Sequence, residues 1–508
     1  MTDTSIPALL SHFGATDSTF ALINPVSGKR VAEIPQMTAE QVETAIKKLR
    51  AHAAPSWSAT PIRDRAKVLL RLHDLMFKNQ DKMLDVLQLE TGKSRAHAFE
   101  EFAGAAGSAR YYGRKAVKFM KKESTGAGVP VLTQTWVEHD PVGVVGVITP
   151  WNYPLALTML DVLPALAAGN VVIQKADNQT ALTTLFCRLL AVESGLPEDA
   201  WTIVVGDGAT VGNAITDHVD YVAFTGSTAT GRMVAERASK RLIGYSLELG
   251  GKNPMIVLQG ANLGRAAELA IGAAFGSAGQ LCVSTERVYV HNADREAFLA
   301  ELSRRTDELV LGKTGHFDSD IGSLTSATQL ARVQGFIADA TEHGARILSG
   351  GVTDPNLGPN FFRPTVLVDV NDAAKMFKSE VFGPVIAVEG YVTIDEAVEK
   401  ANDTEFGLNA SVVGNQAEAI RVASRLKAGS VNVNEGFRAS FASMGSPMGG
   451  MKHSGMGRRN GRQGMLRYTD TRTVGVAKFG FALPTRGRHY KTMAPLLKIL
   501  SALLKRFG

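Results

Sequence analysis

Cysteine is scarce in this sequence: two of the 508 residues are cysteines, Cys187 and Cys282. Two well-separated cysteines make no disulfide framework and are typical of a reducing compartment. The sequence contains no run of 18 apolar residues, so we expect no membrane-spanning helix. The first ten residues lack a charged segment followed by an apolar one, so we expect no secretory signal and a cytoplasmic protein.

Several motifs of common catalytic sites are missing as well. The sequence has no zinc-ligand spacing, no HExxH pattern and no GxSxG elbow, so we expect no bound metal and no serine-hydrolase chemistry. GDGATVG at 206–212 does not match the GxGxxG fingerprint of common dinucleotide-binding folds. None of the eleven histidines is a sequence neighbour of a cysteine, which disfavours a Cys/His protease.

Acidic residues are absent from the end of the chain. Residues 485–508 carry no Asp or Glu and six basic side chains, which are Arg486, Arg488, Lys491, Lys498, Lys505 and Arg506. The whole chain has 55 Lys and Arg against 49 Asp and Glu, so these six residues account for the net charge of +6. The rest of the chain is balanced, and we therefore expect no nucleic-acid partner.

Length and composition predict an α/β protein with two or three domains. A chain of 508 residues is too long for one core, and 50 glycines with 20% charged residues are typical of an α/β enzyme. Helical spacing of apolar residues predicts helices at 39–54 and 63–89. A doubly wound parallel sheet is predicted from four apolar runs, at 142–148, 171–175, 201–205 and 221–225.

Cys282 lies among small residues, in FGSAGQLCVS at 275–284. Small neighbours leave a thiolate accessible, so that it can attack a carbonyl carbon once a base or a positive setting has activated it. A free cysteine is more often a small buried hydrophobic residue. We assign that role to Cys187, which lies in a leucine-rich helical pattern.

Glu248 is the carboxylate that favours a catalytic role for Cys282. It lies in GYSLELGGKN at 244–253, a run that is otherwise apolar and rich in glycine. A carboxylate in such a setting would be partly desolvated, which raises its pKa towards the range of a general base.

Five motifs, in this order along the chain, resemble the aldehyde dehydrogenase superfamily. They are PWNYP at 150–154, FTGSTATG at 224–231, LELGGKNP at 247–254, FGSAGQLC at 275–282 and EVFGP at 380–384. The resemblance extends from about Asn24 to about Thr473 and is greatest to the NADP-dependent succinate-semialdehyde dehydrogenases. It implies oxidation of an aldehyde to a carboxylic acid through a thiohemiacetal and a thioester, with succinate semialdehyde as the expected substrate and succinate as the product.

The resemblance also implies a domain organisation. We expect a doubly wound cofactor domain, an α/β catalytic domain and a small β arm used for oligomerisation, in a homodimer or homotetramer. Their expected ranges are 1–124, 142–251 and 440–465 for the dinucleotide-binding domain, 252–439 for the catalytic domain, 125–141 and 466–485 for the arm, and 486–508 for a basic amphipathic tail.

The family's catalytic roles fall on three residues. Cys282 would form a thiohemiacetal and then a thioester, and Glu248 would activate the water that hydrolyses the thioester. Asn152 and the Cys282 N–H would stabilise the oxyanion. A non-catalytic member of the fold is expected to have lost Cys282 or Glu248, and a CoA-dependent acyl transferase needs no such base, so both alternatives are disfavoured.

NADP is the expected cofactor, with NAD possible. In the resembled family an acidic residue three positions after Lys175 repels a 2′-phosphate, and here that position is Asn178, which favours NADP. Asp177 could turn inward and restore a preference for NAD. GSTATG at 226–231 predicts a helix whose N-terminus holds the pyrophosphate. The full expected cofactor set is Thr149, Trp151, Asn152, Lys175, Asp177, Asn178, Gly226, Ser227, Thr228, Leu249, Glu380 and Phe382.

The identity of the aldehyde stays open. Two arginines that grip the substrate carboxylate in succinate-semialdehyde enzymes are missing here, because the matching positions are Glu193 and Gly276. Arg438, in the expected funnel, could substitute for them. Otherwise an apolar tunnel suited to aromatic or medium-chain aldehydes would be lined by Tyr153, Leu157 and Leu160.

Beyond the resemblance, the tail predicts an amphipathic helix that begins near Pro495. Its apolar face would carry Leu496, Leu500, Leu503 and Phe507. Such a basic segment could give weak peripheral attachment to an anionic membrane. It could equally pack on a neighbouring subunit or on its own catalytic domain, since so short a segment binds lipid weakly.

Overall fold

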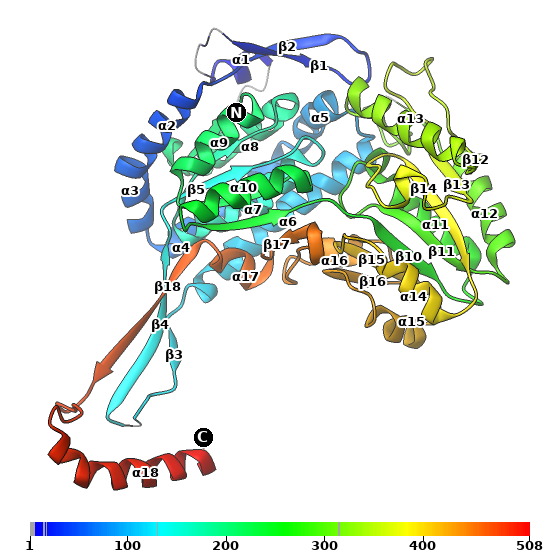
Figure 1. The fold of residues 1–508 in the computed structure, drawn as a ribbon. Helices are drawn as coiled ribbons and strands as arrows, with labels where there is room; N and C mark the ends of the chain where they lie inside the picture. The colour runs from blue at the N-terminus through cyan, green and yellow to red at the C-terminus, as the bar shows by residue number, and fades with distance from the viewer. Residues whose placement is uncertain (1–5, 14–15, 17, 130, 313–314, 508) are drawn as a thin grey trace. The chain divides into compact units, whose positions relative to one another are not determined.

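The computed structural model describes residues 6–13, 16, 18–129, 131–312 and 315–507. The chain forms two compact units. The larger unit comprises Met1–Phe119 and Pro141–Thr469, and the smaller comprises Met120–Asp140 and Asp470–Gly508. Both large sheets of the protein belong to the larger unit (Figure 1).

The first large sheet has six strands, five of them parallel, in the order β17-β9-β8-β5-β6-β7. Its strands are β5 (Val144–Ile148), β6 (Val171–Lys175), β7 (Trp201–Val204), β8 (Tyr221–Thr225), β9 (Gly244–Glu248) and the antiparallel β17 (Gly455–Met456). The strand order reverses between β5 and β8, so the carboxyl ends of these two strands open a crevice for a ligand.

Helices connect successive strands of this sheet, as Figure 1 shows. The connecting helices are α7 (Pro154–Ala168), the 3₁₀ turn η2 (Asn178–Thr180) with α8 (Ala181–Glu193), η3 (Glu198–Ala200), α9 (Gly208–His218) and α10 (Thr228–Lys240). Ser227 caps α10, because its hydroxyl accepts a hydrogen bond from the Thr230 N–H at 3.2 Å. The helix predicted from the glycine-rich motif is therefore confirmed, and its N-terminus lies at the crevice.

The N-terminal part of the larger unit adds a hairpin and a set of helices. Its elements are α1 (Ile6–Leu10), β1 (Thr19–Ile23), β2 (Arg30–Pro35), α2 (Ala39–Lys48), the π-helical turn η1 (Leu49–Ala53), α3 (Ala54–Ala59), α4 (Ile62–Lys78), α5 (Gln80–Thr91) and α6 (Arg95–Phe119). The single helix predicted at 63–89 is wrong, because it breaks at Asn79. The Asn79 side chain donates to the Leu75 carbonyl at 2.8 Å and competes with the helical backbone.

The second large sheet has seven strands in the order β12-β13-β14-β11-β10-β15-β16, parallel except for β12. The strands are β10 (Asn253–Val257), β11 (Thr285–His291), β12 (Arg346–Ser349), β13 (Thr365–Val368), β14 (Val385–Tyr391), β15 (Asn409–Val413) and β16 (Ser430–Val433). Buried hydrophobic clusters around β10 and β11 form its core.

Further helices follow β10 along the chain. They are α11 (Leu263–Phe275), η4 (Gly276–Gly279), α12 (Arg295–Asp307), α13 (Ala327–Glu342), η5 (Lys375–Phe377), α14 (Ile394–Asn402), α15 (Gln416–Ala423), α16 (Arg438–Phe441), η6 (Lys452–Ser454) and α17 (Gly461–Leu466). The last of them, α17, packs on α7 and α6 rather than on the second sheet. Residues 249–252 connect β9 of the first sheet to β10 of the second. Glu248 is the last residue of β9, so it lies where the chain crosses from one sheet to the other. The predicted fold class is confirmed.

The smaller unit contains a three-stranded sheet in the order β18-β4-β3 and a C-terminal helix. Its elements are β3 (Glu123–Thr125), β4 (Thr133–Pro141), β18 (Thr469–Ala477), the short η7 (Gly487–His489) and α18 (Tyr490–Phe507). The predicted start of this helix near Pro495 is wrong, because α18 begins at Tyr490 and Pro495 lies inside it. Proline has no backbone N–H, so one helical hydrogen bond is missing there. Among the described residues, no helix is long and apolar enough to cross a membrane.

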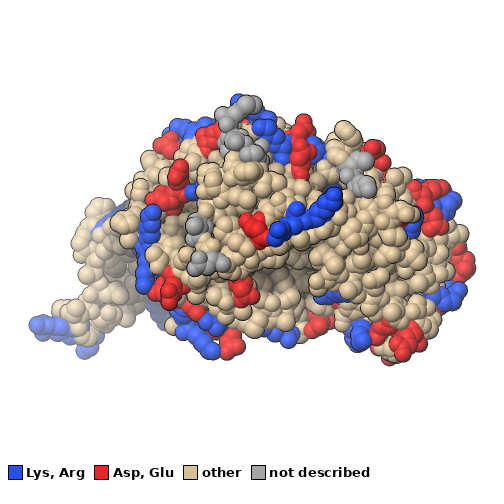
Figure 2. Space-filling model, turned by 90° about the horizontal axis from the view of Figure 1, so that it is seen from above, with Lys and Arg blue, Asp and Glu red and all other residues tan. Residues whose placement is uncertain are grey.

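Charge is mixed on the face of the protein drawn in Figure 2. Lysine and arginine are interspersed with aspartate and glutamate over that face. Many exposed charged side chains of the protein form ion pairs, for example Lys240 with Glu236 at 2.7 Å. The basic excess predicted for the tail lies on α18, which carries Lys491, Lys498 and Lys505 without an acid.

Candidate active site

Asn152 follows β5 and is buried at 4% exposure. Its side-chain Nδ2 donates a hydrogen bond to the Gln280 carbonyl oxygen at 2.9 Å. This contact joins the end of the first sheet to the loop that precedes Cys282. An amide nitrogen carries two protons, so one N–H of Asn152 remains for another acceptor.

The loop before Cys282 has an unusual backbone. Ser277 and Ala278 adopt positive φ angles of 51° and 54°, a left-handed conformation that is strained for residues with a side chain. Gly279 has φ +70°, and a Cβ there would lie 1.9 Å from the Gly383 carbonyl oxygen. The Cys282 carbonyl accepts a hydrogen bond from the Asn253 side chain at 2.8 Å. Contacts with Asn152, Asn253 and Gly383 thus fix the position of this loop.

Glu248 is buried at 3% exposure, and neither carboxylate oxygen has a hydrogen-bond partner among the described residues. Burial raises its pKa to about 7, against the opposing effect of Arg459 and Arg467. An unpaired buried carboxylate is costly, which makes such a group a candidate for a functional role. The desolvation predicted from the sequence is therefore confirmed.

The Cys282 thiol is only partly exposed. Burial raises its pKa to about 12, and the carboxylates of Glu380 and Glu248 add to the effect. The thiol is thus protonated at neutral pH and needs a base before it can act as a nucleophile. Cys187 lies fully buried in α8, so the packing role predicted for it is confirmed.

One pocket, of about 230 Å³, brings the thiol and this carboxylate together. Nine residues predicted from the sequence line it: Trp151, Asn152, Gly226, Ser227, Glu248, Leu249, Cys282, Glu380 and Phe382. Two further lining residues, Gln329 and Arg332 on α13, have no motif around them, so they are not predictable from the sequence. Gln329 donates to the Phe382 carbonyl, and Arg332 donates to the Glu380 carbonyl at 2.8 Å.

Glu380 and Phe382 lie on a loop held by buried charge. The Glu286 carboxylate accepts hydrogen bonds from the N–H groups of Val381 and Phe382 at 3.0 Å, and it pairs with Lys252 at 2.5 Å. Glu380 itself accepts from the Gly251 N–H at 2.9 Å. Burial and the neighbouring Glu286 raise the pKa of Glu380 to about 8.

Five residues of the expected cofactor set, Thr149, Lys175, Asp177, Asn178 and Thr228, are not in the lining of this pocket. Lys175 ends β6 and donates to the Ala176 carbonyl at 3.2 Å, and burial lowers its pKa. Asp177 accepts from the Gln179 N–H at 2.9 Å, and Asn178 accepts from the Gly206 N–H at 2.9 Å. Thr149 accepts from Gln174 at 3.0 Å, and Thr228 donates to the His453 carbonyl at 3.4 Å.

A second pocket, of about 330 Å³, has a largely aromatic and aliphatic lining that includes Tyr153 and Arg438. The Tyr153 hydroxyl accepts a hydrogen bond from Ser277 at 2.9 Å, which joins this pocket to the loop before Cys282. Leu157 and Leu160 are not in its lining. They lie in the hydrophobic core at 3% and 2% exposure, because α7 is buried on all sides.

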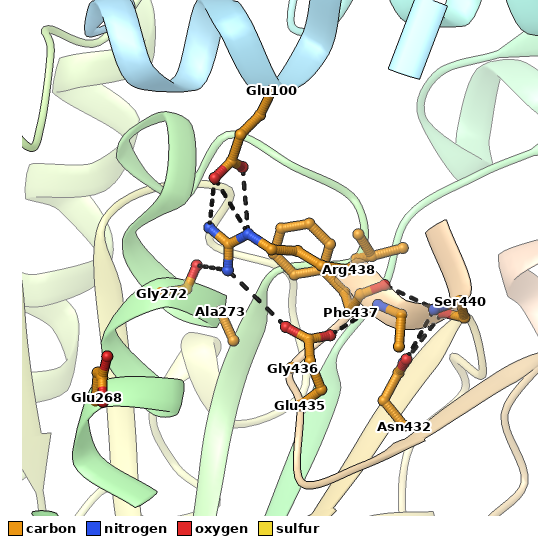
Figure 3. Close-up of polar contacts among 12 residues, drawn as sticks. Glu100, Glu268, Gly272, Ala273, Asn432, Glu435, Gly436, Phe437, Arg438 and Ser440 are labelled. Atoms are coloured by element: carbon orange, nitrogen blue, oxygen red, sulfur yellow. Dashed lines mark hydrogen bonds and ion pairs between the residues drawn. The ribbon is translucent and has the colours of Figure 1, made fainter. Parts of the chain in front are cut away.

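Arg438 is not a free cation. Its guanidinium pairs with the Glu100 carboxylate at 3.1 Å, as Figure 3 shows. Gly276 lies in η4 and Glu193 ends α8, and neither residue lines either of these two pockets. The pair of positions matched to the two missing arginines therefore does not form one site.

Comparison with known proteins identifies the class of this site. A profile of the aldehyde dehydrogenase family matches residues 13–474, and the chain belongs to this family. A Mycolicibacterium smegmatis protein, provisionally named as an NADP⁺-dependent succinate-semialdehyde dehydrogenase, is 45% identical over 94% of this chain and 93% of its own length. A Bacillus subtilis betaine aldehyde dehydrogenase is 36% identical over 89% of this chain and 93% of its own.

Solved structures agree with this assignment. Betaine aldehyde dehydrogenase from Staphylococcus aureus, solved in complex with NAD⁺, superposes with a TM-score of 0.88 at 30% identity and covers 94% of this chain and 98% of its own. An NADP-dependent enzyme from Escherichia coli superposes with a TM-score of 0.86 at 33% identity, covering 91% and 95%. The fold and the enzyme class are those of an aldehyde dehydrogenase.

The unpaired Glu248 carboxylate should lower the stability of the protein. Its pKa is raised from 4.5 to about 7, so its burial penalty is fully present above about pH 7 and absent below about pH 4.5. Glu248→Gln should therefore raise the Tm at about pH 8, and the difference should shrink towards about pH 5. Calorimetry of both proteins measures this, and a wild type more stable than the variant at about pH 8 would contradict it.

Proposed function

We propose that this chain oxidises an aldehyde to a carboxylic acid with Cys282 as the nucleophile and NADP⁺ as the cofactor. The observation that carries the proposal is the unpaired buried carboxylate of Glu248 in the same pocket as the Cys282 thiol. A carboxylate with a pKa of about 7 is suited to take and give protons at neutral pH.

The first step forms a bond between the thiol sulfur and the carbonyl carbon of the aldehyde. Glu248 takes the thiol proton, which the high pKa of Cys282 would otherwise retain. The carbonyl oxygen becomes an oxyanion, stabilised by the second N–H of Asn152 and by the backbone N–H of Cys282. The product of this step is a thiohemiacetal on Cys282.

The residues of the first pocket fit a bound dinucleotide. Gly226 offers bare backbone, since a Cβ there would meet the Phe224 ring at 2.6 Å, and the adjoining α10 N-terminus suits a pyrophosphate. Trp151, Glu380 and Phe382 line the same pocket as Cys282.

When bound, the nicotinamide supplies the hydride acceptor. Loss of hydride leaves a thioester on Cys282. Glu248 releases the thiol proton to solvent and then deprotonates the water that attacks the thioester, so that the carboxylic acid leaves and the Cys282 thiol is restored.

Retention of this base favours hydrolysis over acyl transfer to a thiol such as CoA.

Substitution of Cys282 and of Glu248 should separate formation of the thioester from its hydrolysis. Cys282→Ala should abolish both dehydrogenase and esterase turnover. Glu248→Gln should still release one burst of NADPH, slower than in the wild type because water must take the thiol proton in place of Glu248, followed by a stall at the thioester. Stopped-flow absorbance of NADPH measures both, and steady turnover by the Cys282 variant would refute the nucleophile assignment.

NADP⁺ is supported over NAD⁺ by Asn178. At this position a carboxylate would repel a 2′-phosphate, whereas the neutral Asn178 does not, and Lys175 is near enough in sequence to supply positive charge. Two relatives that are 45% and 46% identical to this chain are named for NADP⁺. Asp177 caps η2 through the Gln179 N–H, which ties its carboxylate to the local backbone.

Asn178→Glu should therefore weaken NADP⁺ binding by about tenfold or more, the size of one unfavourable charge contact. The preference should shift towards NAD⁺. Asn178→Gln is the matched control, because it adds the same length without the charge. Titration of each variant with both cofactors measures the shift, and an unchanged preference would assign control to Asp177 or Lys175.

Two classes of aldehyde are candidate substrates. The names of the relatives point to succinate semialdehyde, whose distal carboxylate needs a cationic partner when it is buried. The lining of the second pocket favours an aromatic or medium-chain aldehyde, because Phe99, Phe437 and Phe441 line it and Arg438 is already paired.

The smaller unit supports a homodimer or homotetramer. In its three-stranded sheet β3 and β18 are edge strands, and an exposed edge strand pairs readily with a second chain. We assign the residues 125–141 and 466–485 to such an arm, 1–124, 142–251 and 440–465 to dinucleotide binding, and 252–439 to catalysis. We place the enzyme in the cytoplasm, where a reactive thiol such as Cys282 stays reduced.

Helix α18 supports weak attachment to an anionic membrane surface. Leu496, Ile499 and Leu503 are exposed on it at 66%, 59% and 50%, and its charged residues are all basic. The side chain of Phe507, predicted on the same face, lies outside the described part of the chain. An amphipathic helix with this charge binds the interface of an acidic bilayer.

Deletion of residues 486–508 should reduce co-sedimentation with vesicles that contain phosphatidylserine, and added salt should reduce binding of the full-length protein. Neutral phosphatidylcholine vesicles are the control. Equal sedimentation of the full-length and shortened proteins would overturn the membrane proposal. Dissociation of the shortened oligomer in gel filtration would instead assign the helix to a subunit contact.

A further inference from the structure

The lining of the second pocket contains an ion pair between Arg438 and Glu100. Arg438 belongs to the short helix α16 and Glu100 to α6, so the pair joins two segments that are more than 300 residues apart in sequence. Both Nε and Nη2 of Arg438 lie within 3.1–3.3 Å of the Glu100 carboxylate oxygens. Figure 3 shows this two-pronged contact between α6 and α16.

The remaining nitrogen of Arg438 is also engaged. Nη1 donates to the Gly272 carbonyl at 3.4 Å and lies 4.0 Å from the Glu435 carboxylate. A Cβ at position 272 would lie 3.1 Å from Nη1, so glycine there leaves room for the guanidinium. Every nitrogen of the guanidinium thus faces an acceptor of the protein, and two of those acceptors are carboxylates (Figure 3).

The rest of the lining is suited to an apolar group. Phe99, Tyr153, Phe437, Phe441 and Met444 contribute most of its large side chains. The Phe437 and Phe441 rings meet edge to face, with centroids 6.3 Å apart, and Phe441 meets Tyr153 in the same way at 6.5 Å. Such a surface gains free energy by burying an apolar tail.

A substrate carboxylate would meet a different environment. To bind at Arg438 it must compete with Glu100, which already holds the guanidinium in the favourable bidentate geometry, and it must approach the negative charge of Glu100 and Glu435. Arg110 is the other cation in the lining. It is exposed, as Glu100 is, so solvent and salt screen both charges, and the contact of Glu100 with Arg438 is what distinguishes Glu100.

We propose that Glu100 sets the charge preference of this aldehyde pocket. By pairing with Arg438 it lowers the affinity for aldehydes that end in a carboxylate and leaves a site for aldehydes with an uncharged, apolar tail. This inference rests on the proposed aldehyde oxidation. It also decides between the two substrate classes, in favour of the apolar one.

The test compares matched pairs of aldehydes on the full-length enzyme with NADP⁺. The pairs are succinate semialdehyde with pentanal and adipate semialdehyde with heptanal, each a carboxylate-ended aldehyde with a neutral one of similar length. The readout is the ratio of kcat/KM within each pair. In Glu100→Gln, an amide oxygen can still accept from Arg438 while the negative charge is lost.

Glu100→Gln should raise the ratio for at least one pair by about three- to tenfold, the range between an exposed ion pair and a charge-assisted hydrogen bond. The gain should lie in KM for the carboxylate substrate rather than in kcat, which a general loss of structure would not produce. The double variant Glu100→Gln with Arg438→Gln should lose this gain, since it acts through Arg438.

Two controls define the result. Glu301→Gln breaks a glutamate–arginine contact on α12, outside both pockets, and should leave the ratio unchanged. Arg110→Gln tests the exposed cation, and a larger change there than in Glu100→Gln would overturn the proposal. A ratio in Glu100→Gln at or below the wild-type value in both pairs would also overturn it, although aldehyde oxidation would stand. Absence of turnover with every aldehyde in the wild type would overturn both proposals.

Discussion

Burial of an unpaired carboxylate beside a thiol is the constraint on which the rest of this site depends. Glu248 has no hydrogen-bond partner among the described residues, and Cys282 lines the same pocket. Desolvation raises the pKa of both groups, so ionisation of either group costs free energy. The protein therefore keeps a protonated thiol and a carboxylate that titrates near neutral pH, and a proton can pass between them when an aldehyde arrives.

Buried ion pairs hold the walls around these two groups. Glu286 and Lys252 fix the loop that carries Glu380 and Phe382. Glu101 pairs with Lys93 and accepts from the N–H groups at the start of α7 at 2.8 and 3.1 Å, directly after Asn152 and Tyr153. Removal of one partner of such a pair leaves a buried charge and typically costs about 3–5 kcal/mol. These buried charges, which line neither pocket, thus maintain the geometry of the site.

The sequence was sufficient for the fold class and for much of the site. Parallel strands, glycine-rich turns and the motifs around Glu248 and Cys282 have local signatures, and nine predicted residues share one pocket. Contacts between distant segments have no such signature. Gln329 and Arg332 stand in an ordinary helix, and the partner of Arg438 is separated from it by 338 positions. Leu157 was predicted to line a tunnel, but its periodicity could not distinguish a tunnel wall from a helix buried on all sides.

The central claim is that the Cys282 thiol carries the acyl group until Glu248 directs its hydrolysis. Rapid quenching of Glu248→Gln with an aldehyde and NADP⁺, followed by peptide mass spectrometry, tests it most directly. The account predicts an acyl adduct on the peptide that contains Cys282 and none on the peptide that contains Cys187. NADPH formation without an adduct on Cys282, or an adduct confined to another residue, would contradict it.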